Sequence, residues 1–153
     1  MPGIVRRSGF TIVELLIVVV VIAILAAITI VAFSGISSQA RDSSREVALR
    51  TVTQGLEMYY QKNGHYPDAC NELNTGCSIS HLAASLVPEH LSTIPDDPGD
   101  SETISYVVGG TPALWGRNYG IFVQYENREP CKYLRGPGAP MGWWSTAPLC
   151  NIE

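Results

Sequence analysis

A single carboxylate, Glu14, stands near the start of a long apolar segment, residues 8–33. From Leu15 to Phe33 the only polar side chain is that of Thr29. An apolar run of this length is about what a helix needs to cross a hydrocarbon core of roughly 30 Å. An acidic group inside hydrocarbon costs about 2.5 to 3.5 kcal/mol at mid-helix and less near an end, so it is a functional candidate by default. We therefore expect Glu14 to need a partner that a simple membrane anchor does not supply.

A short basic leader containing Arg6 and Arg7 precedes the apolar segment. A secretory signal peptide has a shorter apolar region and is cleaved after it, at a small-residue site. Here we expect cleavage before the apolar run, so the helix would stay in the mature chain. An uncleaved membrane anchor and a conventional signal peptide are the alternatives.

The run Arg6-Arg7-Ser8-Gly9-Phe10-Thr11-Ile12-Val13-Glu14-Leu15-Leu16 resembles the class III leader of type IV pilins and type II secretion pseudopilins. The resemblance implies that a membrane aspartyl peptidase, the prepilin peptidase, cuts between Gly9 and Phe10. It also implies that the same enzyme methylates the new amine of Phe10 and that Glu14 becomes the fifth mature residue. The leader would then be residues 1–9.

Elementary chemistry explains why these residue types suit cleavage and assembly. Gly9 has no side chain, so an extended backbone can enter a narrow peptidase site beside the bilayer. The new amine of Phe10 would be a cation without a partner, and the Glu14 carboxylate of an adjacent subunit could supply one. Leaving one member of such a buried pair alone would cost about 3 to 5 kcal/mol, so the pair can fix the register of subunits. Phe10 and Glu14 are therefore the predicted assembly residues.

Charge and cysteine positions bear on the compartment and the partners. All four cysteines follow the apolar segment, and their even number suits an oxidising, exported compartment. We expect a single pass through the cytoplasmic membrane, with the leader inside and the globular part outside. The chain of 153 residues has a net charge of −4, which becomes −6 without Arg6 and Arg7 (8 basic minus 14 acidic residues). General nucleic-acid binding is disfavoured, because it depends largely on Lys and Arg.

The sequence predicts that one long helix continues past Phe33, because no proline occurs between Pro2 and Pro67. Polar residues, Arg45 among them, lie largely between apolar ones in this continuation, and Asn63-Gly64 reads as its stop. The apolar residues recur at helical spacing and predict a buried stripe made of Leu49, Val52, Leu56 and Tyr59 or Tyr60.

Beyond this helix the sequence predicts a globular head with an α+β fold, in which a small antiparallel sheet packs against the long helix. A short helix is expected at 80–87, capped by Ser78 or Ser80. Strands are expected at 103–108, 119–125 and 132–134, where β-branched and aromatic residues lie between Gly, Pro and Asn. The predicted divisions are the leader 1–9, a membrane or filament-core segment 10–33, its amphipathic continuation 34–62 and the head 63–153. The turns at 63–67 and 94–98 also resemble those of pilins and major pseudopilins.

Four cysteines allow three connectivities, and we favour the neighbours in sequence, Cys70 with Cys77 and Cys131 with Cys150. The second pair resembles the C-terminal disulfide region of many type IV pilins. It would tie down the Gly- and Pro-rich tail 136–148, where loop closure could contribute on the order of 3 kcal/mol. Trp143 and Trp144 in that tail are either packing residues, which we favour, or contacts for a partner.

No cofactor is expected, but two metal sites are possible alternatives to these interpretations. A zinc site would use His65, Cys70, Cys77 and His81, but their spacing is not a recognised ligand pattern. Calcium could bind the acidic loop made of Asp96, Asp97, Asp100 and Glu102, for which the alternative is a solvated turn. An enzyme is not expected either, because the chain has no G-x-S-x-G motif.

We therefore predict a prepilin-like structural subunit that is cleaved, N-methylated and polymerised into a type IV pilus or a type II secretion pseudopilus. Its expected partners are the prepilin peptidase, other copies of itself, minor pilins, the inner-membrane assembly platform and, before assembly, membrane lipid. It would end in a filament at the cell surface or in the periplasm. The alternative is a membrane-anchored binding protein or minor tip pilin that captures a ligand through its acidic head and the Trp143-Trp144 tail.

Overall fold

The computed structural model describes the chain except for residues 1–8, 72–73, 99–102, 110–111, 141 and 152–153, together with the side chains of 31, 32, 34 and 112. It divides into two compact units, one ending at Ser37 and the other formed by Ser38–Glu153. We call the first the N-terminal unit and the second the head.

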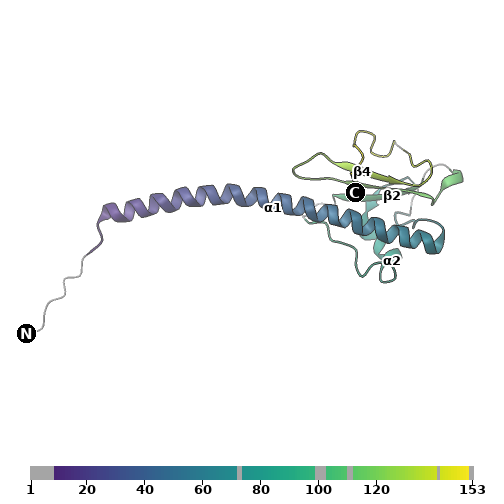
Figure 1. Ribbon diagram of the computed structural model, residues 1–153, viewed down its shortest axis with the longest axis horizontal. Helices are drawn as coiled ribbons and strands as arrows, with labels where there is room; N and C mark the ends of the chain where they lie inside the picture. The colour runs from purple at the N-terminus through teal and green to yellow at the C-terminus, as the bar shows by residue number, and fades with distance from the viewer. Residues whose placement is uncertain (1–8, 72–73, 99–102, 110–111, 141, 152–153) are drawn as a thin grey trace, which may run out of the picture. The chain divides into compact units, whose positions relative to one another are not determined.

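A single helix, α1 (Ile12–Asn63), supplies the described helical part of the N-terminal unit and continues into the head (Figure 1). Its 52 residues confirm the predicted uninterrupted helix. The helix ends where Gly64 adopts a φ of 75°, a left-handed conformation that favours glycine, and the Gly64 N–H donates to the Tyr60 carbonyl at 2.8 Å. The Asn63-Gly64 pair thus acts as the stop that its residue types indicate.

The head contains a four-stranded antiparallel sheet in the order β1-β2-β3-β4. The strands are β1 (Cys77–Ser78), β2 (Ile104–Gly109), β3 (Asn118–Val123) and β4 (Cys131–Arg135). The three predicted strands are present with shifted ends, and the α+β class is confirmed. The two-residue strand β1 was not predicted, because two residues are too few to show an alternating pattern.

Three short helical segments complete the head: η1 (Ile79–Leu82), α2 (Ala83–Leu86) and η2 (Pro112–Leu114). The first two together span 79–86, so the predicted short helix at 80–87 is present one residue earlier. The Ser78 hydroxyl caps η1 by accepting a hydrogen bond from the backbone N–H of Ser80.

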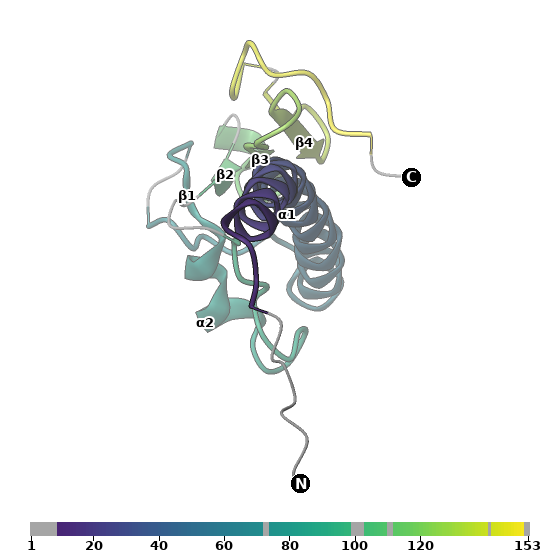
Figure 2. The ribbon, with the colours of Figure 1, turned by 90° about the vertical axis from the view of Figure 1, so that its left-hand side faces the viewer.

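The core of the head forms between α1 and one face of the sheet (Figure 2). The helix contributes the predicted stripe, with Leu49, Val52 and Leu56 almost fully buried and Tyr59 and Tyr60 packed at its margin. The sheet contributes alternate residues of β2 and β3, as expected where successive side chains point to opposite faces. These are Ile104, Tyr106, Val108, Tyr119, Ile121 and Val123.

The opposite face of the sheet is covered by the C-terminal segment. Trp144 stacks on Phe122 with ring centroids 5.5 Å apart, and both tryptophan rings would approach a Cβ placed on Gly120 to 3.0 Å. The buried Lys132 ammonium donates to the Trp143 and Trp144 carbonyls at 3.2 Å each. The two tryptophans thus have the packing role that we favoured.

Candidate functional site

The first turn of α1 holds the carboxylate that the sequence singles out. The Glu14 Oε2 atom accepts hydrogen bonds from the Thr11 backbone N–H and from Thr11 Oγ1, both at 2.8 Å. The Glu14 N–H in turn donates to Thr11 Oγ1 at 3.2 Å. This reciprocal arrangement is a capping box, in which a Thr and a Glu three residues later satisfy the unpaired donors of a helix start.

The capping box gives Glu14 a partner within its own chain. This local partner was not predicted from the sequence. The signal was present, because Thr11-Ile12-Val13-Glu14 matches the [ST]-x-x-[DE] pattern before an apolar run. Both hydrogen bonds to the carboxylate use the same oxygen, Oε2. Within the described residues, Oε1 accepts no further hydrogen bond, so it is available to a donor from outside the chain.

The predicted cleavage residues precede this cap. Gly9 and Phe10 lie outside the helix, and a Cβ placed on Gly9 would meet no described atom within 4 Å. Phe10 is 89% exposed. The peptide bond between them is therefore presented on accessible, non-helical backbone, which is the form that a peptidase needs. The preceding leader residues, 1–8, lie outside the described part of the chain.

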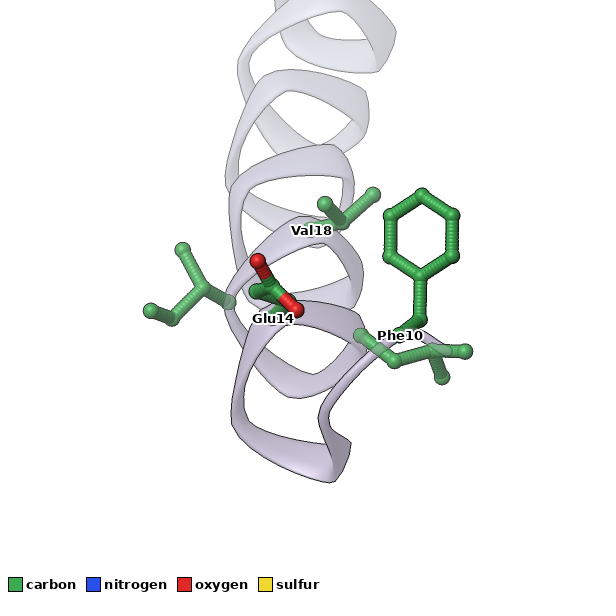
Figure 3. A pocket seen from close by; sticks show the side chains of 5 residues that line it. Phe10, Glu14 and Val18 are labelled. Atoms are coloured by element: carbon green, nitrogen blue, oxygen red, sulfur yellow. The ribbon is translucent and has the colours of Figure 1, made fainter. Parts of the chain in front are cut away.

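Phe10 and Glu14 line the same hollow beside the first turns of α1, together with Leu15, Ile17 and Val18. Figure 3 shows the Phe10 ring beside the helix and the Glu14 carboxylate on the helix surface, below Val18. The hollow is almost wholly apolar except for this carboxylate. It combines an apolar surface with one oriented anion.

The apolar face of the N-terminal unit continues along the helix. The large apolar side chains described between Phe10 and Phe33 each expose about half or more of their surface. By length and composition, α1 is the one described helix that qualifies to cross a membrane. At about 25 cal/mol per Å² of apolar surface, such exposure in water is unfavourable, so lipid or other helices must cover it.

The head holds both predicted disulfides. Cys70 is bonded to Cys77 and Cys131 to Cys150, which confirms the favoured connectivity. The second bond fastens the C-terminal segment beside β4, where the Lys132 N–H donates to the Pro148 carbonyl at 2.8 Å. Because their cysteines are oxidised, Cys70 and Cys77 cannot supply the thiolates that the weighed zinc site would need.

The acidic loop weighed for calcium has another role at its best-placed residue. The Asp97 carboxylate pairs with Arg45 at 3.1 Å and accepts a hydrogen bond from the Thr103 hydroxyl. Asp100 and Glu102 lie outside the described residues. Within the part of the chain that the structure describes, no group of three or more His, Cys, Asp or Glu side chains is placed to hold a metal ion.

The position of Arg45 differs from the prediction, which grouped it with the polar residues that lie between those of the apolar stripe. Arg45 is 2% exposed. Its guanidinium pairs with Asp42 at 3.1 Å, Asp97 at 3.1 Å and Glu126 at 3.2 Å, and donates to the Pro98 carbonyl at 3.0 Å. A buried cation is acceptable when opposite charges and hydrogen bonds surround it. Asp42 is three residues away on the same helix, but Asp97, Pro98 and Glu126 come from distant parts of the chain, so helical periodicity could not reveal them.

Asp42 extends this cluster to the loop after β3. Its carboxylate accepts from the backbone N–H groups of Glu126 and Asn127 at 2.8 and 2.9 Å. Burial raises the pKa of Asp42, but these hydrogen bonds and that from Arg45 outweigh it and hold the pKa below its ordinary value. The cluster joins α1 to two loops and is a structural centre of the head.

Comparison with known proteins agrees with the chemistry of the N-terminal unit. Residues 4–30 match the family described as "Prokaryotic N-terminal methylation motif". The type IV major pilin protein PilE1 of Neisseria gonorrhoeae is 24% identical over 131 residues, which are 81% of this chain and 71% of that protein. Type II secretion system core protein G of Escherichia coli is 24% identical over 141 residues, which are 90% of this chain and 86% of that protein.

A third relative matches over a shorter stretch. The type IV major pilin protein PilA of Myxococcus xanthus is 34% identical over 68 residues, which are 44% of this chain and 31% of that protein. No solved structure matches the chain. No catalytic family is indicated by the motif or by these relatives. Through the methylation motif and these relatives, the chain is similar to type IV pilins and to a type II secretion core protein.

Proposed function

We propose that this protein is a structural subunit that is cleaved between Gly9 and Phe10, methylated on the Phe10 amine and polymerised into a pilus or pseudopilus. The observation that carries the proposal is the exposed apolar helix that begins within the methylation motif and holds the single carboxylate of Glu14 in its first turn. Its relatives are named as a major pilin and as a secretion-system core protein. The prepilin peptidase, an inner-membrane assembly platform and other copies of the chain are its proposed partners.

Apolar packing of α1 segments would supply the cohesion between subunits, replacing the lipid that covers the helix before assembly. The proposed location before assembly is therefore the cytoplasmic membrane, with the disulfide-bonded head on the outer side, where disulfides persist. Assembly would move the helix from lipid into a bundle of other helices. No turnover chemistry is involved.

Glu14 would have one partner before assembly and a second one after it. The Thr11 cap satisfies Oε2 while the chain is alone. Oε1 would then accept the methylated amine of Phe10 from a neighbouring subunit and fix the axial register. The cap lowers the cost of holding a carboxylate near the end of an apolar helix, because its hydrogen bonds replace those lost to water.

Mass spectrometry of the N-terminal peptide tests this function most directly. Cells that make the chain with its native processing enzyme are separated into membrane and sheared-surface fractions. A product that begins at N-methylated Phe10 in the sheared fraction is expected for a pilus subunit. The same product confined to membranes would indicate a periplasmic pseudopilin or a minor subunit. An intact Met1 form in the presence of active peptidase would overturn the proposal.

A Glu14→Ala variant tests the proposed register. It should be processed normally but should yield few filaments, because the neighbour's amine loses its anion. Thr11→Val provides the comparison, since it removes the hydroxyl hydrogen bonds of the cap and leaves the carboxylate in place. Normal filament yield from Glu14→Ala would contradict the register role while leaving the subunit function intact.

The alternative, a tethered protein that captures a ligand through Trp143 and Trp144, has less support. The stacking of Trp144 on Phe122 and the carbonyl bonds to Lys132 assign these residues to packing. Abundance separates the two functions, because a main filament subunit should be plentiful in sheared fractions and a tip component should be rare.

A further inference from the structure

The two ends of the head differ in charge. One end, next to residues 38–46 of α1, is here called the acidic end and has more carboxylates than guanidinium groups. Its carboxylates are Asp42, Glu46, Asp96, Asp97, Glu126 and Glu129, and its cations are Arg41, Arg45, Arg50 and Arg128. The Arg45 and Arg41 pairs with Glu126 show that the loop after β3 lies at this end.

The other end, next to residues 57–65 of α1, is here called the basic end. Arg135 at the end of β4 pairs with Glu57 at 3.3 Å, which places that strand end beside the last turns of α1. The turn before β3 lies there too, because the Tyr66 N–H donates to the Gly116 carbonyl at 2.6 Å. This turn carries Trp115 and Arg117.

Arg117 is the unusual cation of the basic end. It is exposed, and within the described residues its guanidinium has no ion pair or hydrogen bond, whereas Lys62 pairs with Glu89 and Arg135 with Glu57. Trp115, two residues away, is 50% exposed. Trp and Arg are the residue types most enriched among those that dominate binding energy at protein interfaces.

The acidic end has the complementary feature. Asp96 and Glu129 are exposed, and neither has an ion pair within the described part of the chain. Arg117 at one end, and Asp96 and Glu129 at the other, are therefore unpaired charges of opposite sign. They lie at opposite ends of the part of α1 that belongs to the head.

We propose that the basic end of one head, centred on Arg117 and Trp115, binds the acidic end of another copy of this chain through Asp96 or Glu129. When each head offers its two ends to two different neighbours, such a contact is heterologous, and it repeats along an open filament where it does not close into a ring. A two-fold contact through the basic end would bring Arg117 against itself, which like-charge repulsion disfavours. This inference rests on the proposed filament function and adds a contact between heads to the cohesion of the helices.

Charge reversal in the full chain, made with its native processing enzyme, tests the contact. Arg117→Glu should lower the yield of sheared filaments by about tenfold, because it places a like charge against a carboxylate. The amount of processed subunit in the membrane should be unchanged. Arg117→Lys is the matched control, since it changes the same residue but keeps its positive charge and should leave the yield near that of the unaltered chain.

Reciprocal charge exchange identifies the partner surface. Combining Arg117→Glu with Asp96→Arg or with Glu129→Arg should restore filaments in at least one of the two double variants. Full yield from Arg117→Glu alone, or failure of both double variants to restore it, would overturn the head contact and leave the filament function standing. Absence of filaments from the unaltered chain would instead overturn the proposed function itself.

Discussion

The N-terminal unit and the head solve the problem of apolar surface in opposite ways. The head buries its apolar side chains between α1 and the sheet, with Val52, Leu56 and Ile121 fully covered. The N-terminal unit leaves side chains such as Leu16 and Leu25 about 60% exposed along a single helix. The head therefore covers its own apolar side chains, whereas the first part of α1 leaves its apolar surface uncovered by the described part of the chain.

The polar groups of the two units also differ in where their partners come from. Charged groups in the head meet partners from distant segments, as Arg45 does with Asp97 and Glu126. Among the described residues of the N-terminal unit, Glu14 has only the local cap from Thr11. Long-range pairing stabilises a fixed tertiary structure, while a local cap leaves the carboxylate able to accept a second partner.

The largest expected effect is a loss of leader cleavage that leaves the folding of the head unchanged. Gly9→Val should block cleavage and therefore assembly, because a β-branched side chain would stand at the peptidase site. The head should fold normally in this variant. The measurement is the mass of the N-terminal peptide in membranes. Gly35→Val serves as the control, since a Cβ at Gly35 also meets no described atom within 4 Å and this glycine lies outside the motif.

A mature-sized product from Gly9→Val would show that the cleavage site lies elsewhere. Loss of processing in the Gly35→Val control would indicate a general effect of valine on insertion.

A matched pair of leucine truncations would sharpen the contrast in burial. Leu56→Ala should lower the free energy of unfolding of the head by about 2 to 5 kcal/mol, because it removes fully buried contacts and leaves a cavity. Leu16→Ala removes the same atoms from a side chain that is 60% exposed and should leave unfolding of the head unchanged. Denaturant unfolding monitored by near-UV circular dichroism measures both. Equal destabilisation by the two variants would contradict the division into independent units.

The disulfides belong to the head alone, which gives the next prediction. Replacing Cys131 and Cys150 together by Ser should lower the free energy of unfolding by about 3 kcal/mol, because the cross-link closes a loop and limits the unfolded chain. Cleavage of the leader should be unaffected. Thermal unfolding of the purified protein, compared with processing in the same cells, checks both parts. An unchanged melting temperature would mean that the bonds around Lys132 hold the C-terminal segment without the cross-link.

The smallest expected effect is a change in how the stability of the head depends on acidic pH. The pKa of Asp42 is lower in the folded head than its ordinary value of 3.8. Its ionised form therefore stabilises the fold above that pH, and this contribution is lost as the pH falls through the folded pKa. The head should lose stability below about pH 4. In an Asp42→Asn variant the loss should be shallower, starting from lower stability at neutral pH. Parallel acid profiles for the two proteins would contradict this role.

Local patterns carried much of what could be predicted. The methylation motif, the uninterrupted helix, its apolar stripe and the stop at Asn63-Gly64 depend on neighbours within a few residues, so they are readable without tertiary structure. Three of the four strands were also predicted. Their ends were less accurate, because hydrogen bonding to other strands decides where a strand stops.

The tertiary structure alone decided the features that join distant segments. The burial of Arg45 required carboxylates from both ends of the head sequence, and the position of Trp144 required Phe122 on another strand. The opposed charges of the two ends of the head also emerge only from the fold, because Arg117 and Glu129 are near in sequence and are carried to opposite ends by β3. Local sequence was enough to identify the apolar helix and the stripe that faces the core, because periodicity and composition are local properties. The fold decided which charges meet, because such pairing depends on contacts that no local pattern encodes.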